Sequence, residues 1–419
     1  MAPGYQVLSG DGGFPFNPQE LETATHVGPS YVYNTMRDNS YDTDAFQEQR
    51  NSDSHLGITL GYYDIAQCAS AFGANDCRVR DGRDIVSRRG RTPSSTRDHR
   101  IKRTRSDRMT HDALPPGWTR FRFGDFVCTV VSDGILEMGP ARTDFPTADP
   151  AELDRLLVQY YLPVENVRLN QNLLIVDTGE KRILFDTGVG IDADLGRATF
   201  GPATGRAIPN MRAAGIDPTD IDIVAITHAH PDHCWGLVDD VGSKLYPNAE
   251  VAISATDFDY WTDLSRVEEA PNEHMKDHFR GAHKNLMPYR DRLRLLDDGS
   301  ELTPAITAIA TPGHSPGHLV YRITSDGQTM LCWGDLCHHH VVLLKRPQWA
   351  FLFDHDQPAA TYQRMRIYDL VDRNRFAVFA YHFPFPGLGH LVREEHTYTW
   401  LPAELDLATP AITQEGDQR

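Results

Sequence analysis

The stretch "ITHAHPDHCWG", residues 226–236, decides what fold and what kind of site this chain is expected to have. It follows the apolar run "IDIVA" and places three histidines and one aspartate within six positions. His228 and His230 are two residues apart, so both side chains can point the same way from extended backbone. The proline after them forces a turn, so Asp232 and His233 can approach from another side. The stretch is therefore either a histidine-rich polar loop or a set of side chains that converge on a cation.

The chemistry of these side chains points to a metal site. Imidazole nitrogen and carboxylate oxygen are the ligand atoms that Zn²⁺ and related divalent ions use in proteins. One open catalytic zinc takes three protein ligands and a water, so four ligands in one stretch favour two ions. Further candidates follow later apolar runs, where α/β proteins place their pocket residues. These are His314 in "TPGHSPGH", Asp335 in "CWGDL" and His382 in "AYHFPFPG".

In this order, the seven residues resemble the metallo-β-lactamase superfamily over about residues 120–400, including "FDTG" at 185–188. The resemblance implies a four-layer αβ/βα sandwich with two metals at one edge of the paired sheets. The alternation of strand and helix patterns after Phe121 also indicates a layered α/β fold, with "RFAVFAYHF" as its last strand. By resemblance, one metal is held by His228, His230 and His314, the other by Asp232, His233 and His382, and Asp335 bridges them.

The residues also narrow the branch of the superfamily. The antibiotic-degrading branch carries no acid at the position of Asp335, which argues against β-lactams as the main substrate. His230 stands where flavodiiron oxidases have glutamate, which favours zinc-type hydrolysis. Nuclease members need a basic face, whereas the catalytic region here is acidic. The stretches "LYPNAEVAISATDFDYW", "GAHKNLMPY" and "HFPFPGLGH" resemble methyl parathion hydrolase and its lactonase and esterase relatives.

The resemblance implies a binuclear hydrolase that cleaves small esters, lactones or organophosphate triesters. Two neighbouring cations would lower the pKa of a shared water and hold a bridging hydroxide that attacks the substrate. Asp335 and Asp232 are the candidate catalytic residues, since the first would fix the metal spacing and the second is placed to ligate and to handle the proton. Zn²⁺ is the expected ion, with Mn, Fe or Co as alternatives. Asp186 in "FDTG" would orient a ligand histidine, or else serve only the turn.

Histidines and aromatic side chains near the expected centre are candidates for the substrate pocket. The run His338, His339 and His340 follows Asp335 closely, and one of the three would line the pocket or support a ligand. The same run could also be a plain polar loop. Alternating aromatic residues fit an apolar wall, although they also pack cores. The pocket candidates are His339, Trp349, Phe351, Phe383 and Phe385.

Residues 1–108 differ in composition from residues 109–419. The first part is polar and turn-rich, and its segment 78–108 carries twelve Lys or Arg against four Asp. Such a segment buries too little apolar surface to offset the entropy of ordering it. We therefore expect a largely disordered, dispensable N-terminal extension and a catalytic domain that begins near Met109, directly after the basic run.

Composition limits the partners and the compartment. The formal net charge of −17 argues against nucleic acid as a partner. The six cysteines show no disulfide-type spacing, no apolar run has the length of a membrane span, and the N-terminal stretch lacks a secretory pattern. We expect a cytoplasmic protein with a small-molecule substrate and no membrane contact. The sequence does not decide whether the protein forms a homodimer, which substrate is its native one or which metal it uses in the cell.

Two other functions fit part of the sequence. A thioesterase of the glyoxalase II type would share the metal ligands, but it needs a basic cluster to hold the carboxylates of glutathione, and none is evident. A metal-stabilised, non-catalytic binding protein would use the basic segment 78–108 and would contain metal without turning over a substrate.

Overall fold

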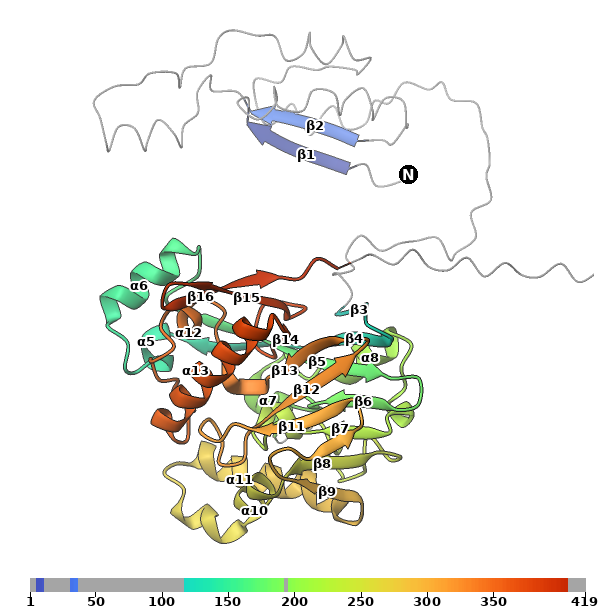
Figure 1. Ribbon diagram of the computed structural model, residues 1–419. Helices are drawn as coiled ribbons and strands as arrows, with labels where there is room; N and C mark the ends of the chain where they lie inside the picture. The colour runs from blue at the N-terminus through green and yellow to red at the C-terminus, as the bar shows by residue number, and fades with distance from the viewer. Residues whose placement is uncertain (1–4, 11–30, 37–116, 192–194, 406–419) are drawn as a thin grey trace, which may run out of the picture. The chain divides into compact units, whose positions relative to one another are not determined.

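The computed structural model describes residues 5–10, 31–36, 117–191 and 195–405 (Figure 1). The chain divides into two compact units, Met1–Asp107 and Arg108–Arg419. In the first unit, β1 (Tyr5–Gly10) pairs in parallel with β2 (Tyr31–Met36). We expected no regular element there, because two six-residue runs are too short to give a sustained period. The expected disorder and dispensability of residues 1–108 otherwise concern positions outside the described ones.

The second unit contains two seven-stranded sheets. The first sheet is antiparallel from β3 to β6 and parallel from β6 to β9. Its strands, in spatial order, are β3 (Trp118–Phe123), β4 (Phe126–Gly139), β5 (Val167–Asp177), β6 (Arg182–Phe185), β7 (Ile223–Ala225), β8 (Glu250–Ser254) and β9 (Leu293–Leu296). The second sheet is antiparallel except for the parallel pair β13–β14. Its strands, in spatial order, are β10 (Glu301–Thr303), β11 (Ile306–Ala310), β12 (Leu319–Ser325), β13 (Gln328–Cys332), β14 (Ala377–Phe379), β15 (Leu388–Glu394) and β16 (Thr397–Pro402).

Helices cover the outer faces of both sheets (Figure 1). On the first sheet lie α8 (Ala207–Ala213), α9 (Pro231–Cys234), α10 (Ala255–Thr262) and α11 (Glu273–Leu286). On the second sheet lie α5 (Ala141–Asp144), α6 (Pro150–Gln159), α12 (Val342–Lys345) and α13 (Gln357–Asn374). The remaining helical elements are α7 (Gly196–Phe200), η2 (Pro218–Asp220), η3 (Leu264–Glu269), η4 (Met287–Arg292) and η5 (Gly334–Leu336). The expected four-layer α/β sandwich is confirmed.

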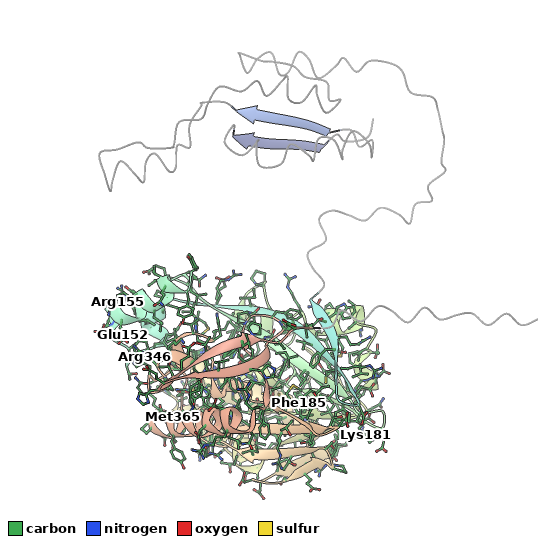
Figure 2. The ribbon with its side chains drawn as sticks, turned by 45° about the horizontal axis from the view of Figure 1, so that its top comes forward. Glu152, Arg155, Lys181, Phe185, Arg346 and Met365 are labelled. Atoms are coloured by element: carbon green, nitrogen blue, oxygen red, sulfur yellow. The ribbon has the colours of Figure 1, made fainter. Side chains whose placement is uncertain are left out.

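Three apolar clusters hold these layers together. The middle cluster lies between the sheets, takes side chains from both and includes Phe185 (Figure 2). There the ring centroids of Phe185 and Tyr321 are 5.3 Å apart. The alternation of β12, with Tyr321 and Ile323 in the middle cluster and Val320 in an outer one, follows from the two-residue period of a strand. At the outer edge, Arg346 forms an ion pair with Glu152 of α6 (Figure 2).

The last hairpin of the second sheet was not expected. "RFAVFAYHF" was expected to be the last strand, but β15 and β16 follow β14 and pair with each other through six residue pairs. The hairpin turns at Glu395 and His396, where Glu395 takes a φ of +53°, and this pair lacks the Asn-Gly or Asp-Gly signal from which hairpins are recognised. Within the ranges described, no helix combines the length and the apolar character needed to cross a lipid bilayer.

Candidate metal centre

The seven candidate ligands meet at one edge of the sandwich, where strands end. His228 and His230 follow β7, and Asp232 and His233 lie in α9 directly afterwards. The other three belong to the second sheet: His314 lies between β11 and β12, Asp335 lies in η5 after β13, and His382 follows β14. Their exposed fractions range from 0% to 8%. Side chains separated by about 150 positions therefore share one buried cluster.

The cluster contains two groups of potential ligand atoms. In the first group, which consists of His228, His230 and His314 with Asp335, the ligand atoms all lie within 4.8 Å of one another. Nε2 of His314 is 3.2 Å from Nε2 of His228 and 2.9 Å from Nδ1 of His230. The second group, Asp232, His233 and His382, meets the same distance criterion. We refer to all seven residues as the seven-residue cluster.

Asp335 lies between the two groups. Its Oδ1 is 3.1 Å from Nε2 of His233 and 3.2 Å from Nε2 of His382. Its Oδ2 is 3.3 Å from Nε2 of His314 and 3.7 Å from Nε2 of His228. Among the described residues, Nε2 of His233 and Oδ1 of Asp335 are buried without a hydrogen-bond partner, although they approach each other closely. The lone pairs of these two atoms point towards each other, and such an arrangement suits the binding of cations between them.

Three of the ligand histidines are held through the ring nitrogen that points away from the cluster. Each Nδ1 lies at hydrogen-bond distance from an oxygen, so it carries the proton and leaves the Nε2 lone pair for a metal. The pairs are His233 with Oδ2 of Asp186 (2.8 Å), His314 with Oδ1 of Asp354 (3.0 Å) and His382 with the carbonyl oxygen of Asn170 (2.8 Å). Asp186 of "FDTG" therefore contacts a candidate ligand histidine, and its orienting role stays a prediction.

Two buried side chains tie the ligand-bearing loops together. The carboxylate of Asp257 in α10 accepts hydrogen bonds from the backbone N–H of Ala229 (2.7 Å) and of Gly317 (2.6 Å). These residues flank ligands of different sheets, so Asp257 fixes the two loops relative to each other. Nε2 of His318 accepts a hydrogen bond from the backbone N–H of Asp335 (3.0 Å). In "TPGHSPGH", His314 therefore belongs to the seven-residue cluster, and His318 holds the backbone of Asp335 in position.

Gly334 permits the close approach of Asp335 to the first sheet. Its φ of +51° lies in the left-handed region, where residues with a Cβ are disfavoured. A Cβ at this position would lie 2.8 Å from the side chain of Thr227, which precedes the first ligand histidine. A larger residue would push Asp335 and His228 apart.

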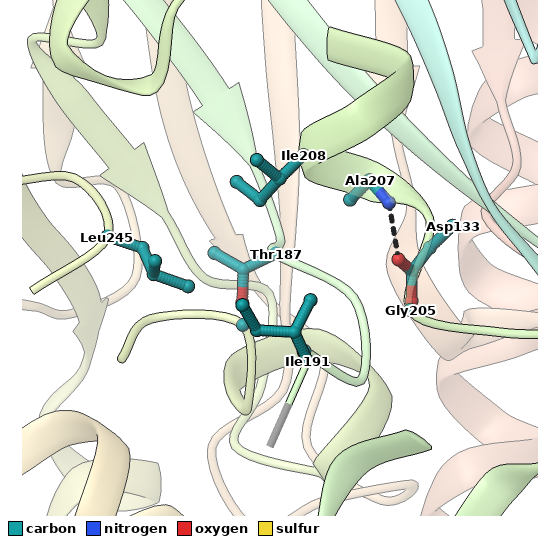
Figure 3. Close-up of a pocket in the computed structure, with 9 residues that line it drawn as sticks. Asp133, Thr187, Ile191, Gly205, Ala207, Ile208 and Leu245 are labelled. Atoms are coloured by element: carbon teal, nitrogen blue, oxygen red, sulfur yellow. Dashed lines mark hydrogen bonds between the residues drawn. The ribbon is translucent and has the colours of Figure 1, made fainter. Parts of the chain in front are cut away.

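Buried Asp133 supports the loop after β6, which contacts the second group. Its carboxylate accepts a hydrogen bond from the backbone N–H of Ala207 (2.7 Å; Figure 3). It accepts another from the backbone N–H of Val189 (2.9 Å). In the same loop, Thr187 donates from its backbone N–H to the carbonyl oxygen of His233 (2.8 Å). Burial raises the pKa of Asp133 to about 7, although the backbone hydrogen bonds oppose the shift.

The histidines of the seven-residue cluster differ in the direction in which their pKa is shifted. Burial and neighbouring histidines lower the pKa of His228 and His230 well below the usual value. Burial also opposes protonation of His314, but hydrogen bonds to Asp335 and to a second aspartate outweigh it and raise its pKa to about 9. Burial likewise opposes protonation of His233, and nearby carboxylates outweigh it and raise its pKa. Without metal, protons therefore balance the buried carboxylates, and metal binding would displace them.

Of the three consecutive histidines after Asp335, the first contacts the cluster. Nε2 of His338 lies 3.0 Å from Oδ2 of Asp335, and its ring stacks on Phe351 with centroids 3.8 Å apart. His339, the residue named from the sequence as a pocket candidate, accepts hydrogen bonds at Nδ1 from the backbone N–H of Val341 and of Val342 (3.1 Å each). Its observed contacts thus cap the next helix.

The other pocket candidates occupy different places. Trp349 and Phe383 are buried in the apolar cluster around the second sheet, and Phe383 lies 4.8 Å from Trp400, centroid to centroid. Phe385 is 37% exposed. Phe351 belongs to the same apolar cluster as Trp349 and Phe383. It is also linked to the seven-residue cluster, because it stacks on His338, which contacts Asp335. A substrate-binding role for the candidates stays a prediction.

Several residues that shape the site were not identified from the sequence. Asp354 precedes α13 in "FDHDQP", and Arg364 lies within that helix, 18 positions or more from any candidate ligand. Arg364 has no exposed surface and donates to Oδ2 of Asp354 (3.1 Å) and to the carbonyl oxygen of Leu336 (3.0 Å). An aspartate before a helix indicates only an N-cap, so no local pattern predicts this contact.

Comparisons with known proteins found similarities to a family model and to solved structures over the part of the chain that carries the cluster. Residues 167–336 match the family model described as the metallo-beta-lactamase superfamily. Two solved structures align with about seven tenths of this chain, and the alignments include nearly all of the chains in those structures. One is AidC, a dizinc quorum-quenching lactonase in complex with a product, with 27% identity, a TM-score of 0.64 and coverage of 69% and 98%. The other is the hydrolase AbOPH of the beta-lactamase superfamily, with 28% identity, a TM-score of 0.65 and coverage of 70% and 100%.

The curated relatives match shorter parts. An N-acyl homoserine lactonase of Bacillus thuringiensis is 24% identical over 171 residues, which are 38% of this chain and 60% of that protein. Residues 3–89 match a different family, the thiamine pyrophosphate enzyme C-terminal TPP binding domain. There, acetolactate synthase of Bacillus subtilis is 39% identical over 81 residues, which are 19% of this chain and 14% of that enzyme. The chain thus spans less than two thirds of either curated relative.

Proposed function

We propose that this chain, whose described C-terminal part belongs to the metallo-β-lactamase superfamily, is a two-metal hydrolase of small uncharged esters and lactones. The observation that carries the proposal is the position of Asp335 between two groups of buried ligand atoms. Its Oδ1 approaches His233, its Oδ2 approaches His314, and Nε2 of His382 lies 3.2 Å from both oxygens. His228, His230 and His314 would hold one ion, and Asp232, His233 and His382 the other. A pair of divalent ions, Zn²⁺ in the first instance, supplies a polarised substrate oxygen and an activated water.

The side chains of the protein would hold the two groups of ligands in position and exclude bulk water from the metals. Asp335 fixes the separation of the two groups, because its two oxygens are bound within one rigid carboxylate. Asp232 is the ligand with the most exposed side chain, at 12%, so its carboxylate is placed to take a proton from an incoming water. The hydroxyl of Tyr381 donates to the carbonyl oxygen of Asp232 (2.5 Å) and holds that residue in place. Burial of the other ligands keeps bulk water from competing for the metals.

Lactones are the first substrate class to test, and phosphotriesters the second. AidC, a lactonase, matches over most of its length at 27% identity, which supports an uncharged cyclic ester as substrate. The motifs that resemble methyl parathion hydrolase support organophosphate triesters as the alternative. The formal net charge of −17 disfavours anionic substrates through repulsion at long range.

The proposal is tested on the purified full chain. Elemental analysis would give the metal content, and turnover would be measured with N-hexanoyl homoserine lactone, p-nitrophenyl acetate and paraoxon before and after chelation. We expect two metal equivalents, loss of turnover on chelation and recovery with Zn²⁺, Mn²⁺ or Co²⁺. Turnover that is indifferent to chelation contradicts a metal mechanism. Bound metal without turnover of any substrate favours the non-catalytic binding protein instead.

A pair of aspartate variants separates the bridge from general effects of charge. Asp335→Asn removes the second anionic oxygen, so we expect fewer than two bound metal equivalents and a large fall in kcat/KM. The matched control is Asp326→Asn in the exposed turn between β12 and β13, where φ is +46° and asparagine is tolerated. Equal metal content and activity in the two variants would contradict the bridging role.

A further inference from the structure

Helix α11 carries two histidines whose ring nitrogens meet outside the seven-residue cluster. His274 and His278 are four residues apart, so they lie on the same face of the helix. Their Nε2 atoms are 3.2 Å apart, and their ring centroids are 4.6 Å apart at an interplanar angle of 69°. His274 is exposed, whereas His278 is 4% exposed. The pair is thus open on one side and fixed in the protein on the other.

The separation of the two nitrogens suits a shared metal ion. Zinc–nitrogen bonds of about 2.0–2.1 Å place two ligands of a tetrahedral ion about 3.3–3.4 Å apart. Inside the seven-residue cluster, the Nε2 atoms of His228 and His314 are likewise 3.2 Å apart. Two histidines at positions i and i+4 of one helix are also the arrangement found in helical zinc sites.

A hydrogen bond between the two rings is the alternative arrangement, and it would need a proton on one Nε2. Nδ1 of His278 is buried without a partner among the described residues in both arrangements, so it favours neither. With the proton on Nδ1 of each ring, both Nε2 lone pairs face the same point.

We propose that His274 and His278 bind one further divalent transition-metal ion, separate from the seven-residue cluster. The expected ions are those that imidazole prefers, Zn²⁺, Ni²⁺ and Cu²⁺, with water completing the coordination. Because the chain supplies two ligands here and three or four at each group of the cluster, this site fills at higher free metal. The proposal does not depend on which reaction the cluster catalyses.

The site lies beside the cluster. The ring centroid of His278 is 5.7 Å from that of His230 and 6.0 Å from that of Trp261, while His274 faces Phe353 at 6.1 Å. An ion at this position adds positive charge next to the first group of ligands. Excess metal would therefore alter the cluster electrostatically without displacing its ions.

The test measures bound metal, so it stands apart from any activity. The full chain is dialysed to equilibrium against a series of free Zn²⁺ concentrations, and the zinc bound to each protein molecule is determined by elemental analysis. We expect the wild type to bind one equivalent more than His274→Gln at high free zinc, and the two proteins to bind equally at low free zinc. His278→Gln should lose the same equivalent.

The control is His396→Gln, which removes an exposed histidine from the turn between β15 and β16. It should bind zinc like the wild type. Thermal unfolding in chelator shows whether each variant keeps its fold, and exposed His274 can be replaced without disturbing the core. If His274→Gln and the wild type bind the same number of zinc ions over the whole series, the site does not exist.

Discussion

The guanidinium of Arg364 lies 3.1 Å from Oδ2 of Asp354, and neither side chain has any exposed surface. The other carboxylate oxygen, Oδ1, is 3.0 Å from Nδ1 of His314. Arg364 also donates to the carbonyl oxygen of Leu336, the residue after Asp335. One buried arginine of α13 therefore supports both His314, through Asp354, and the backbone next to Asp335, and its effect on the seven-residue cluster can be separated from its effect on the fold.

Replacing Arg364 by methionine should strongly destabilise the protein. The substitution keeps an apolar stem of similar length but leaves the buried carboxylate of Asp354 without its guanidinium partner, with only His314 beside it. Breaking one side of a buried ion pair costs about 3–5 kcal/mol. We expect the free energy of unfolding, measured by urea denaturation followed by circular dichroism, to fall by about that amount.

Arg373→Met, on the same helix, is the matched control. Arg373 forms an ion pair with Asp369, but its side chain is 74% exposed. Exposed pairs contribute about 0–1 kcal/mol, so this variant should unfold almost like the wild type. A loss as large as that of Arg364→Met would show that burial of the charge is not what makes Arg364 important.

The aspartates behind two ligand histidines should set metal affinity. Asp186→Asn and Asp354→Asn keep the side-chain shape but remove the charge that orients and polarises His233 and His314. Changes in such supporting residues typically weaken metal binding about 10–100-fold. We expect each variant to lose one ion at a lower chelator concentration than the wild type, with zinc release followed by a colorimetric indicator.

Asp356→Asn controls for the loss of an acidic side chain near the site. Asp356 is the N-cap of α13 and accepts a hydrogen bond from the backbone N–H of Ala359 (3.0 Å). Asparagine caps helices about as well as aspartate, so this variant should retain metal like the wild type. Unchanged chelator sensitivity in both Asp186→Asn and Asp354→Asn would contradict the orienting role.

The sequence was sufficient for the fold and for the residues that gather at the centre, because both leave local marks. A strand has a two-residue period, and each member of the seven-residue cluster follows an apolar run, as His382 follows "RFAVFAY". The order of the strands and the residues behind the ligands leave no such mark. Arg364 reaches the site only because α13 packs on the second sheet, and Asp257 because α10 packs beside β8.

The aromatic candidates show the same limit. Phe351 and Phe383 have similar settings in the sequence and lie in the same apolar cluster, yet Phe351 also stacks on His338, whereas Phe383 packs against Trp400. The two-residue spacing of aromatic residues does not say which face of a segment meets the core. The contact of His338 with Asp335 similarly depends on the bend of η5, where Asp335 departs from helical geometry.

Removing residues 1–108 should leave a folded, metal-binding protein. The chain divides into compact units at Asp107, and the match to the thiamine pyrophosphate family ends at residue 89, before the match to the metallo-beta-lactamase superfamily begins. All seven members of the cluster lie in the second unit. We expect a variant that starts at Met109 to bind the same number of metal ions as the full chain and to unfold at a similar temperature. Loss of the fold, as seen by circular dichroism, would show that the first unit is needed.

Stability should fall as the pH rises towards neutrality because of Asp133. Burial raises the pKa of its carboxyl from 3.8 to about 7 in the folded protein. The folded state therefore binds more protons than the unfolded state between these values, and the stabilisation present below pH 3.8 is lost as the pH rises through 7. One group shifted in this way changes the free energy of unfolding by up to about 1.4 kcal/mol per pH unit.

Asp133→Asn removes this titration and so measures it. Its amide cannot accept the hydrogen bonds of both Val189 and Ala207, so the variant should be less stable than the wild type by about 1–3 kcal/mol. Because only the wild type loses stability through Asp133, the gap between the two proteins should shrink from pH 5 to pH 8 in urea denaturation. A gap that widens with pH would mean that the backbone hydrogen bonds outweigh burial and keep Asp133 ionised in the folded protein.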